Sequence, residues 1–487
     1  MLPRALYKVD AVREIERRAV DDSHIPSWEL MERAGGAAFA LLREQWPHAT
    51  RLAVVCGPGN NGGDGYVVAR LAHGCGLQVD VVQVGQATIS GDAGRALGQM
   101  QTAGLVLGAS LAPLREAEVI VDALFGIGLN KLPQGAACAA IEAINSSPAA
   151  RLSLDIPSGL AANTGEVLGI AVAATATITF IGVKPGLLTG AAADHIGALH
   201  FAGLEVPAQA YSSVTPTAHS VDWATLKALL PRRRRTAHKG DNGHVLIIGG
   251  APGMSGAVRL TAAAALRVGA GLVSVATHPS TTAEVSAARP EIMVHGVRDA
   301  ADLIGLLARA TVIAIGPGLG QSRWALDLFA CVREGRQPVI FDADALSLLA
   351  IDPDSNAARI ITPHPGEAAR LLGGITTRAI AHDRFAAARD LHTRYGGAVV
   401  LKGAGTIVES CGVTQVIRGG NPGMATGGMG DALTGVIAGL LAQGMALNEA
   451  AVAGAALHAA AADCAAVAGE RGLLASDLMP HLRALVN

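Results

Sequence analysis

The sequence is poor in aromatic and charged residues. Of its 487 residues only 3% are aromatic and 16% are charged, whereas half are hydrophobic and 60 are glycines. The formal net charge of −2 gives no electrostatic reason to expect binding to nucleic acid or to an acidic membrane. Ample apolar side chain remains to bury large cores, and abundant small residues let backbone approach a ligand closely. The basic run Arg232–Arg235 is an exception, which we interpret as a solvated linker segment.

The sequence also has no cysteine pair at motif spacing, and its first residues do not predict a secretory leader. None of the six cysteines forms a CxxC pair or has zinc-finger spacing to histidine, and scattered single thiols indicate a reducing compartment. The N-terminus lacks the apolar core of a signal peptide. The apolar stretch Gly435–Gly469 is interrupted by polar residues such as Glu449 and Asp463, which favours a buried alanine-rich helix pair over a membrane span. We therefore expect a cytoplasmic protein with no membrane partner.

Strand-like and helix-like segments alternate along both halves of the chain. In the front half we expect helices at Tyr66–His73 and Gly91–Ala103 and strands at Arg51–Cys56, Gln78–Val84, Val119–Ala123, Arg151–Asp155 and Thr175–Ile181. From Lys239 the alternation restarts, with strands expected at His244–Ile248, Leu272–Ala276, Thr311–Ile315, Val339–Asp342, Ile360–Thr362 and Ala398–Leu401. This order predicts α/β domains with parallel sheets covered on both faces. Prolines and small polar residues predict a linker at Val206–Ser220, and we place the domains at 1–216 and 222–487.

The most distinctive front-half motif is GPGNNGGDG, residues 57–65, which lies between an expected strand and an expected helix. It contains the GxGxxG pattern but no P-loop lysine, so the glycines alone are a weak signal. Glycines expose backbone N–H groups and a helix N-terminus to phosphate. The side chains of Asn60, Asn61 and Asp64 add oxygen atoms that suit a hard cation. A tight strand-to-helix turn without function is the alternative.

Two further loops follow strands of the same expected sheet. Asp122 stands before the glycines of DALFGIGL, and Asp155 opens DIPSG. Each aspartate alone is as consistent with a helix cap as with a functional role. Ligands in parallel sheets bind beyond the carboxyl ends of the strands, so three such loops together favour an active site.

With FIGVKPG (residues 180–186), these motifs resemble the NAD(P)HX epimerase family over Leu6–Glu205. The resemblance implies a Rossmann-like three-layer domain of the YjeF N-terminal type. It implies a potassium ion held by Asn61, Asp122 and Ser158. It also implies a binding site for the hydrated dinucleotide made of Asn60, Asn61, Gly62, Gly63, Asp64, Gly126, Ile127, Gly128, Leu129, Asn130, Lys131, Leu132 and Asp155.

Epimerisation inverts a carbon that bears a hydroxyl group, so bonds must break and re-form with proton transfers. A positioned acid–base pair contributes roughly 10²–10⁴-fold to such a step. We assign Asp155 and Lys184 as this catalytic pair. The alternative for Lys184 is a surface lysine whose stem covers apolar residues.

The last glycine-rich segment of the back half, GGMGDALTG, carries the second chemistry. Glycines that lead into an apolar helix present unpaired N–H groups, an anion hole for a phosphoryl group. Asp431 at the helix start can accept a proton from a substrate hydroxyl, and we assign it as the catalytic base. The alternative is a simple helix cap.

KGDNGH, GPGLG, DADAL, TPHPGE, KGAGT and GNPGMATGGMGDALTG together resemble the ribokinase-like superfamily and, within it, the ADP- or ATP-dependent NAD(P)HX dehydratases. The resemblance covers most of Arg235–Asn487. It implies that Ala257, Gly318, His364 and Asp431 face the hydrated dinucleotide. It also implies an adenine-nucleotide site at Lys402, Gly403, Ala404, Gly405, Thr406 and Gly430, with Mg²⁺ neutralising the phosphates. His364 has the alternative role of a satisfied loop histidine.

The joint hypothesis is one bifunctional enzyme, an isomerase and a lyase, that repairs hydrated NADH and NADPH. The alternative is a small-metabolite kinase fused to a dehydrogenase-type or non-catalytic binding domain. A dehydrogenase predicts an acidic ribose-binding residue about 20 residues after the fingerprint, and Asp80 lies at the wrong end of its strand for that role. The sequence leaves open ADP against ATP and NADHX against NADPHX. We expect a homo-oligomer.

Overall fold

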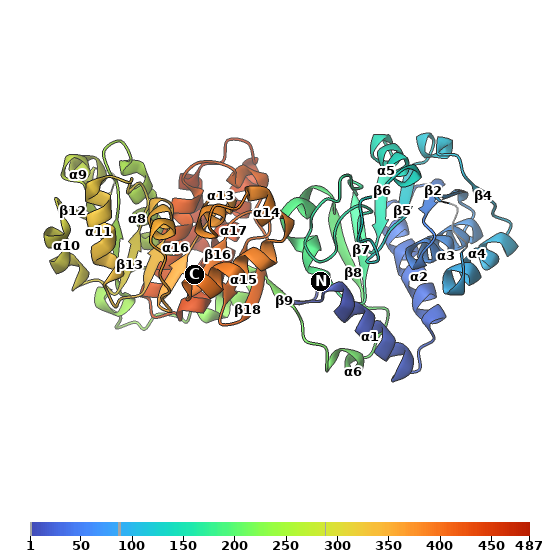
Figure 1. Cartoon of the computed structure of the whole chain (residues 1–487), viewed down its shortest axis with the longest axis horizontal. Helices are drawn as coiled ribbons and strands as arrows, with labels where there is room; N and C mark the ends of the chain where they lie inside the picture. Colours follow the sequence, from blue (N-terminus) through green and yellow to red (C-terminus); the bar gives the residue numbers. More distant parts are fainter. Residues whose placement is uncertain (1, 86–88, 288) are drawn as a thin grey trace. The chain divides into compact units, whose positions relative to one another are not determined.

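The computed structural model describes residues 2–85, 89–287 and 289–487. The chain divides into two compact units, residues 1–219 and residues 220–487 (Figure 1). Each unit is built around its own sheet, and each is described separately below.

Unit 1 contains a fully parallel sheet, as the alternation of its segments predicts. In spatial order its strands are β4 (Leu107–Gly108), β3 (Gln78–Gln83), β2 (Arg51–Cys56), β5 (Val119–Ala123), β6 (Ala150–Leu154), β7 (Ala176–Phe180) and β8 (Ala198–Ala202). Cys56 of β2 pairs with Ala123 of β5, so the glycine-rich loop and the loop after Ala123 begin side by side. The register therefore gathers the motif loops at one sheet edge.

Both faces of this sheet are buried. Along β2, Leu52 and Val54 belong to a core with α1–α4, whereas Ala53 and Val55 belong to a second core with α5. The helices of unit 1 are α1 (Val9–Asp21), α2 (Ser27–Gln45), α3 (Asn60–Gly74), α4 (Gly91–Thr102), α5 (Ala136–Ser146) and α6 (Ala208–Tyr211), with 3-10 turns at Ala112–Arg115, Pro185–Leu188 and Gly190–Asp194. Successive strand residues point to opposite faces, so this division confirms the expected three-layer α/β architecture.

The helix after β2 begins earlier than predicted. We expected it to start at Tyr66, but α3 starts at Asn60 and takes the glycines into its first two turns. The tight packing of this region explains the difference, because a Cβ on Gly62 would lie 2.0 Å from the Gly57 carbonyl oxygen, and one on Gly57 would lie 2.0 Å from the Leu124 carbonyl oxygen. Close backbone contact thus outweighs the low helix propensity of glycine.

Gly62→Ala is expected to destabilise unit 1 by about 1–3 kcal/mol, because the added methyl group meets backbone atoms that cannot move aside. Gly59→Ala is the matched control in the same loop, since nothing lies within 4 Å of the Cβ that it would carry. Chemical unfolding of both variants measures the difference. Equal stability of the two variants would contradict the packing argument.

The prediction of an irregular linker at Val206–Ser220 was wrong in part. Helix α6 forms within it and strand β9 (Ala218–Val221) begins within it, and β9 pairs antiparallel with β1 (Ala5–Leu6), with Ala218 opposite Leu6. The partner strand comes from the other end of unit 1, so no local pattern could reveal this pairing.

Unit 2 has a mostly parallel sheet with an antiparallel end. From that end the order is β18 (Val413–Ile417), β17 (Ile407–Ser410), β16 (Ala398–Leu401), β15 (Arg359–Ile361), β14 (Val339–Phe341), β13 (Val312–Ile315), β10 (His244–Ile248), β11 (Leu272–Thr277) and β12 (Met293–Gly296). Strands β16, β17 and β18 pair antiparallel, and the others pair parallel. Val245 and Ile247 pack under helices, whereas Leu246 and Ile248 are buried on the opposite face.

The helices of unit 2 include a closely packed group, α8, α16 and α17. All the α-helices in the described residues of unit 2, in chain order, are α7 (Trp223–Leu226), α8 (Ser255–Val268), α9 (Thr282–Ser286), α10 (Ala300–Leu307), α11 (Arg323–Arg333), α12 (Asp344–Ile351), α13 (Pro365–Leu371), α14 (Thr377–His382), α15 (Arg384–Tyr395), α16 (Met429–Ala442), α17 (Leu447–Ala465) and α18 (Leu478–Leu485). Short 3-10 turns lie at Lys227–Leu229, Lys239–Asn242, Pro279–Thr281, Pro422–Met424, Ala466–Ala468 and Ala475–Asp477. A Cβ on Gly435 would lie 2.1 Å from the Thr261 carbonyl oxygen, and one on Gly439 would lie 2.4 Å from a Val268 methyl carbon.

The apolar stretch near the C-terminus forms the expected buried helix pair, α16 and α17. By length and composition alone, Leu447–Ala468 could cross a membrane, but two thirds of its apolar window (67%) is buried inside the structure. In this structure the stretch therefore forms part of the hydrophobic core of unit 2.

Candidate functional sites

A cavity of about 570 Å³ lies at the carboxyl ends of β2, β5, β6 and β7 in unit 1. Its walls include predicted site residues from all the motif loops: Asn60, Asn61, Asp64, Gly126, Ile127, Gly128, Leu129, Asn130, Lys131, Asp155 and Lys184. Helices α1, α2 and α4 supply further wall residues. The cavity therefore unites motifs that are more than 100 residues apart in sequence.

Not every predicted residue reaches this cavity. Gly62 and Gly63 are buried within α3 and allow its close packing, and Leu132 is 59% exposed beyond the cavity wall. Asp122 and Ser158 lie behind the wall, where Ser158 Oγ accepts a hydrogen bond from the backbone N–H of Phe125 at 2.8 Å.

Asp155 and Lys184 form a buried ion pair at the ends of β6 and β7. Lys184 Nζ donates to Asp155 Oδ1, and the other carboxylate oxygen of Asp155 accepts from the Ile127 backbone N–H at 3.2 Å. Asp155 has a left-handed backbone conformation, with φ of 64°. Such strain in a non-glycine residue costs of order 1–3 kcal/mol and clusters at functional sites.

The ammonium group of Lys184 is saturated by protein acceptors. Besides Asp155, it donates to Thr179 Oγ1 at 3.0 Å and to the Phe180 carbonyl oxygen at 2.9 Å. A lysine ammonium has three donors, so each of them is used. Lys184 is buried and holds Asp155 in place. In this arrangement its ammonium group has no spare N–H with which to act as the proton donor that we expected.

The predicted cation ligands lie around the loop after β5. The Asp122 carboxylate is fully buried and accepts from Ser158 Oγ at 2.6 Å, from Ser158 N at 2.9 Å and from Ser153 Oγ at 2.8 Å. Burial raises the pKa of Asp122, although the hydrogen bonds from Ser158 and Ser153 oppose the shift. Among the described residues no lysine, arginine or histidine forms an ion pair with it.

Asn61 is the third predicted cation ligand, and its amide is buried. Neither its oxygen nor its nitrogen has a hydrogen-bond partner among the described residues. A Cβ on Gly126 would lie 3.3 Å from Asn61 Oδ1 and 3.1 Å from Asp155 Oδ2, so the amide is close to the Asp155–Lys184 ion pair. Unpartnered buried amides cost free energy, and the oxygen-rich donor set fits a hard monovalent cation.

Further carboxyl groups line the same cavity. Glu16 of α1 was not among the expected site residues, and Asp64 of α3 was. Burial raises the pKa of both groups, and the nearby Asp155 carboxylate raises them further. Besides the fully engaged Lys184, the cavity lining includes the cations Arg13 and Lys131, so both carboxyl groups and cations face the cavity.

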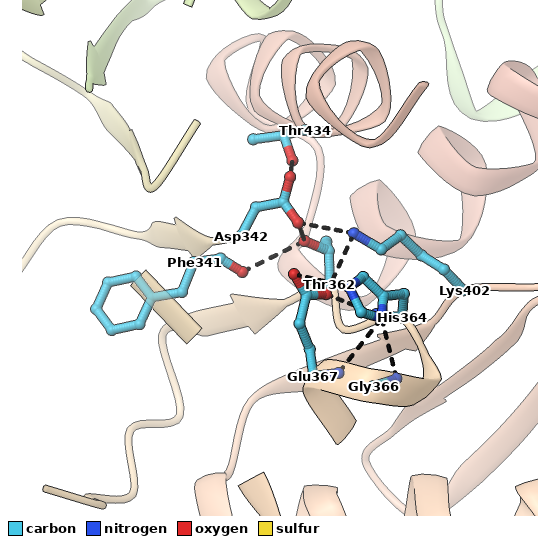
Figure 2. A network of polar contacts seen from close by, with 8 residues as sticks. All are labelled: Phe341, Asp342, Thr362, His364, Gly366, Glu367, Lys402 and Thr434. Atoms are coloured by element: carbon cyan, nitrogen blue, oxygen red, sulfur yellow. Dashed lines mark hydrogen bonds and ion pairs between the residues drawn. The ribbon is translucent and has the colours of Figure 1, made fainter. Parts of the chain in front are cut away.

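In unit 2 a polar network connects the strand ends to α16 (Figure 2). Asp342 follows β14 and accepts from Thr362 Oγ1 at 2.8 Å, Lys402 Nζ at 2.8 Å and Thr434 Oγ1 at 2.9 Å. Burial raises the pKa of Asp342, but attraction to Lys402 and these hydrogen bonds outweigh it and leave the pKa below its usual value. Asp342 and Thr434 were missed as site residues because burial hides such contacts from sequence patterns.

His364 and Glu367 form the cap of α13, as Figure 2 shows. His364 Nδ1 accepts from the Gly366 N–H at 3.0 Å, and Glu367 accepts from the His364 N–H at 2.7 Å. Because Nδ1 is an acceptor, the ring is neutral with its proton on Nε2, and burial lowers the pKa of His364. Its side chain is 52% exposed, and Nε2 lies 3.5 Å from Glu367 Oε1.

The N-terminus of α16 has the form expected of an anion hole. Gly428 is its N-cap, in the left-handed conformation, and no side chain caps the helix. Asp431 lies two residues inside the helix, not at the cap, and among the described residues its carboxylate accepts no hydrogen bond. Burial and the nearby Asp342 raise the pKa of Asp431 to about 7.

The remaining predicted residues of unit 2 fall into two groups beside this network. Gly318 is next to Ala257, since a Cβ on Gly318 would lie 3.3 Å from the Ala257 Cβ. A Cβ on Gly430 would lie 3.3 Å from Lys402 Nζ. The loop of Lys402, Gly403, Ala404, Gly405 and Thr406 follows β16, and the buried Arg384 guanidinium donates to the Lys402 carbonyl oxygen at 3.3 Å.

A second cavity of about 570 Å³ lies elsewhere in unit 2. Its walls include Trp223, Lys227, Arg418 and Asp463, and none of the predicted site residues. The chemistry-bearing residues converge on the network of Figure 2 instead, and we assign no role to this cavity.

Comparisons with known proteins match the two units to two different families. A family described as NAD(P)H-hydrate dehydratase matches residues 245–483, and one described as YjeF-related protein N-terminus matches residues 27–186. A bifunctional NAD(P)H-hydrate repair enzyme of Coxiella burnetii is 49% identical over 486 residues, which cover 99% of both chains. The chain belongs to the family of bifunctional NAD(P)H-hydrate repair enzymes.

The repair enzyme of Escherichia coli, which is 46% identical over 499 residues, covers all of this chain with 95% of its own length. A crystal structure of a ribokinase-like superfamily protein from Enterococcus faecalis matches 55% of this chain and 94% of its own, with 29% identity and a TM-score of 0.51. The expected ribokinase-like fold of the rear half is confirmed. Since single repair enzymes contain both halves, the alternative of a kinase fused to a dehydrogenase-type domain is not supported.

Proposed function

We propose that the protein repairs hydrated NADH and NADPH in two steps. Unit 1 interconverts the R and S hydrates. Unit 2 phosphorylates the ring hydroxyl of the S hydrate with ADP or ATP, and loss of phosphate restores the reduced nicotinamide. The family to which the chain belongs supports the overall reaction, and the geometry of the two sites supports the division of labour.

The single observation that best supports the proposed phosphorylation in unit 2 is the position of Asp431 in the first turn of α16. An unbonded carboxylate there can accept the proton of the substrate hydroxyl, while the helix N–H groups stabilise the transferring phosphoryl group. Lys402 is held by Asp342 at the same place, next to Gly430. His364, Ala257 and Gly318 would bind the hydrate, and the loop from Lys402 to Thr406 would bind the nucleotide.

Mg²⁺ would neutralise the phosphates in this step. The described residues include no group of three or more His, Cys, Asp or Glu side chains that could hold a metal. This fits Mg²⁺, which usually binds through one or two carboxylates, substrate phosphates and water. Of the three carboxylates near Lys402, Asp342 accepts its hydrogen bond and Asp431 is proposed as the base, which leaves Glu367 as the one that would assist the metal.

In unit 1, Asn61, Asp122 and Ser158 would hold a potassium ion behind the cavity. Such an ion supplies positive charge to the buried Asp122 carboxylate and to the unpartnered Asn61 oxygen. Asp155 then acts on the substrate as base, with Lys184 as its positioning partner.

The proposed function is tested by incubating the protein with mixed hydrate epimers, Mg²⁺ and either nucleotide. Full recovery of reduced-nicotinamide absorbance is expected, because both epimers become accessible to unit 2. Recovery of only the S fraction would contradict the role of unit 1, and no recovery would contradict the whole proposal.

The pH dependence of the rear step follows from Asp431. The base must be ionised, and burial raises the pKa of Asp431 to about 7. We expect the dehydration rate, measured with the S hydrate at saturating nucleotide, to fall as the pH drops below about 7, approaching tenfold for each unit. A rate that stays constant down to pH 5 would contradict the assignment.

A reducing compartment suits the six cysteines, which are all free thiols in the structure. We accordingly propose a cytoplasmic enzyme. Assembly into a homo-oligomer stays a prediction.

A further inference from the structure

The epimerase site needs a second proton-transfer group. Hydration of the reduced ring places the hydroxyl on the carbon next to the ring nitrogen, because the nitrogen lone pair stabilises a cation there. Inversion of this carbon by way of a planar cation requires an acid for the departing hydroxyl and a base for the water that enters on the other face. Asp155 can serve one of these roles. The ammonium of Lys184 already donates to three protein acceptors and has no N–H left for the substrate.

We infer that Glu16 of α1 is the catalytic acid that complements Asp155 in the epimerase cavity. Glu16 lines the cavity from the helix wall, together with Val12 and Arg13, whereas Asp155 lines it from the strand ends. The two carboxyl groups are close enough to interact electrostatically. The inference rests on the proposed function of unit 1 and adds a catalytic residue to it.

The environment of Glu16 favours the protonated form of its carboxyl group more than water does. Burial raises the pKa of Glu16, and the Asp155 charge raises it further. The titratable and charged groups that line the cavity with it are Asp155 and Lys184 at the strand ends, Lys131 in the loop after β5, Asp64 on α3, Asp92 on α4 and, on its own helix, Arg13. Burial and the Asp155 charge outweigh the opposing attraction of Lys184 and Arg13, so the protonated form of Glu16 is favoured relative to an exposed glutamate.

The step balances without any oxidant or co-reactant. The protonated Glu16 gives its proton to the hydroxyl oxygen, the C–O bond breaks with its electron pair on oxygen, and water leaves while the nitrogen lone pair forms a C=N⁺ bond. A water molecule then forms a new C–O bond on the opposite face, the lone pair returns to nitrogen, and Asp155 takes the surplus proton. In the reverse direction the two carboxyl groups exchange roles.

The test uses the full-length protein and one purified hydrate epimer, without nucleotide, and follows the other epimer by chromatography after subtracting the protein-free rate. Glu16→Gln is expected to lower the exchange rate 10²–10⁴-fold. Glu14→Gln is the matched control on the same helix; Glu14 pairs with Arg17 and Arg18 at the surface, outside the cavity, and its variant should exchange at the wild-type rate. Glu16→Asp keeps a carboxyl group and should retain more activity than Glu16→Gln.

Two readouts separate catalysis from a structural role. The wild-type exchange rate should fall as the pH rises through the pKa of Glu16, and Glu16→Gln should lose this limb. In ¹⁸O-labelled water each inversion should place ¹⁸O in the product hydroxyl. Exchange by Glu16→Gln within threefold of wild type, Glu16→Asp no better than Glu16→Gln, or retained oxygen would overturn the inference. A wild-type protein that exchanges no epimers would instead refute the proposed function of unit 1.

Discussion

Asp431→Asn is expected to lower the turnover of the dehydration step 10²–10⁴-fold, the range lost when a general base is removed. Nucleotide binding should be retained, because the substitution takes no positive charge away from the phosphates and removes a carboxylate near them. The substitution should also raise stability above neutral pH. The pKa of Asp431 is raised to about 7 by burial and by Asp342, so the ionised form that prevails above pH 7 costs folding free energy.

This combination of lost activity and gained stability distinguishes a catalytic base from a structural aspartate. Turnover is measured with the S hydrate at saturating nucleotide, nucleotide binding by calorimetry and stability by chemical unfolding at pH 8. Asp463→Asn is a suitable control, because Asp463 only accepts hydrogen bonds from the 420–421 loop. A fully active Asp431→Asn enzyme would refute the assignment.

Asp155→Asn is expected to reduce epimer exchange by a similar factor while the rear half dehydrates the S hydrate at its normal rate. The amide cannot accept the proton of the entering water as a carboxylate does. The exchange rate is measured from one purified epimer by chromatography, and the dehydration rate by reduced-nicotinamide absorbance in the same preparation. Exchange at the wild-type rate in a folded variant would show that Asp155 is not part of the chemistry.

The buried partner complicates this variant, because Asp155→Asn leaves the Lys184 ammonium without its carboxylate. Removing one member of a buried ion pair typically costs about 3–5 kcal/mol. The double variant Asp155→Asn/Lys184→Met removes both charges and should unfold closer to the wild-type denaturant concentration. If it is equally inactive in exchange, instability is excluded as the cause.

The sequence was most informative where strands are short, apolar and buried. Strands β2 and β5 match the expected residues at both ends, since buried parallel strands are continuous apolar runs bounded by turns. The start of α3 was six residues earlier than expected, because Gly62 owes its helical conformation to contacts with other loops. Strand β9 was missed because its partner, β1, lies some 210 residues away in sequence.

For the sites, the sequence predicted which loops converge but not what each side chain does there. Asp155 and Lys184 meet as expected, yet their pairing engages every donor of the lysine. Glu16 lies on an amphipathic helix where it resembles any surface glutamate, and only the cavity distinguishes it from Glu14. Asp342 was noted in its motif, but its saturation by Thr362, Lys402 and Thr434 depends on three separate segments.

The seam between α8, α16 and α17 gives the rear domain an unusual sensitivity. A Cβ on Gly435, Gly439 or Gly454 would lie 2.1–2.6 Å from an atom of a neighbouring helix, so there is no space for one more carbon atom. Most protein interiors are destabilised chiefly by substitutions to a smaller side chain, which leave a void. At this seam even the substitution of glycine by alanine, which adds a single methyl group, is expected to be destabilising. If α16 holds the phosphoryl group at its first turn, as we propose, this close packing also fixes the position of that turn.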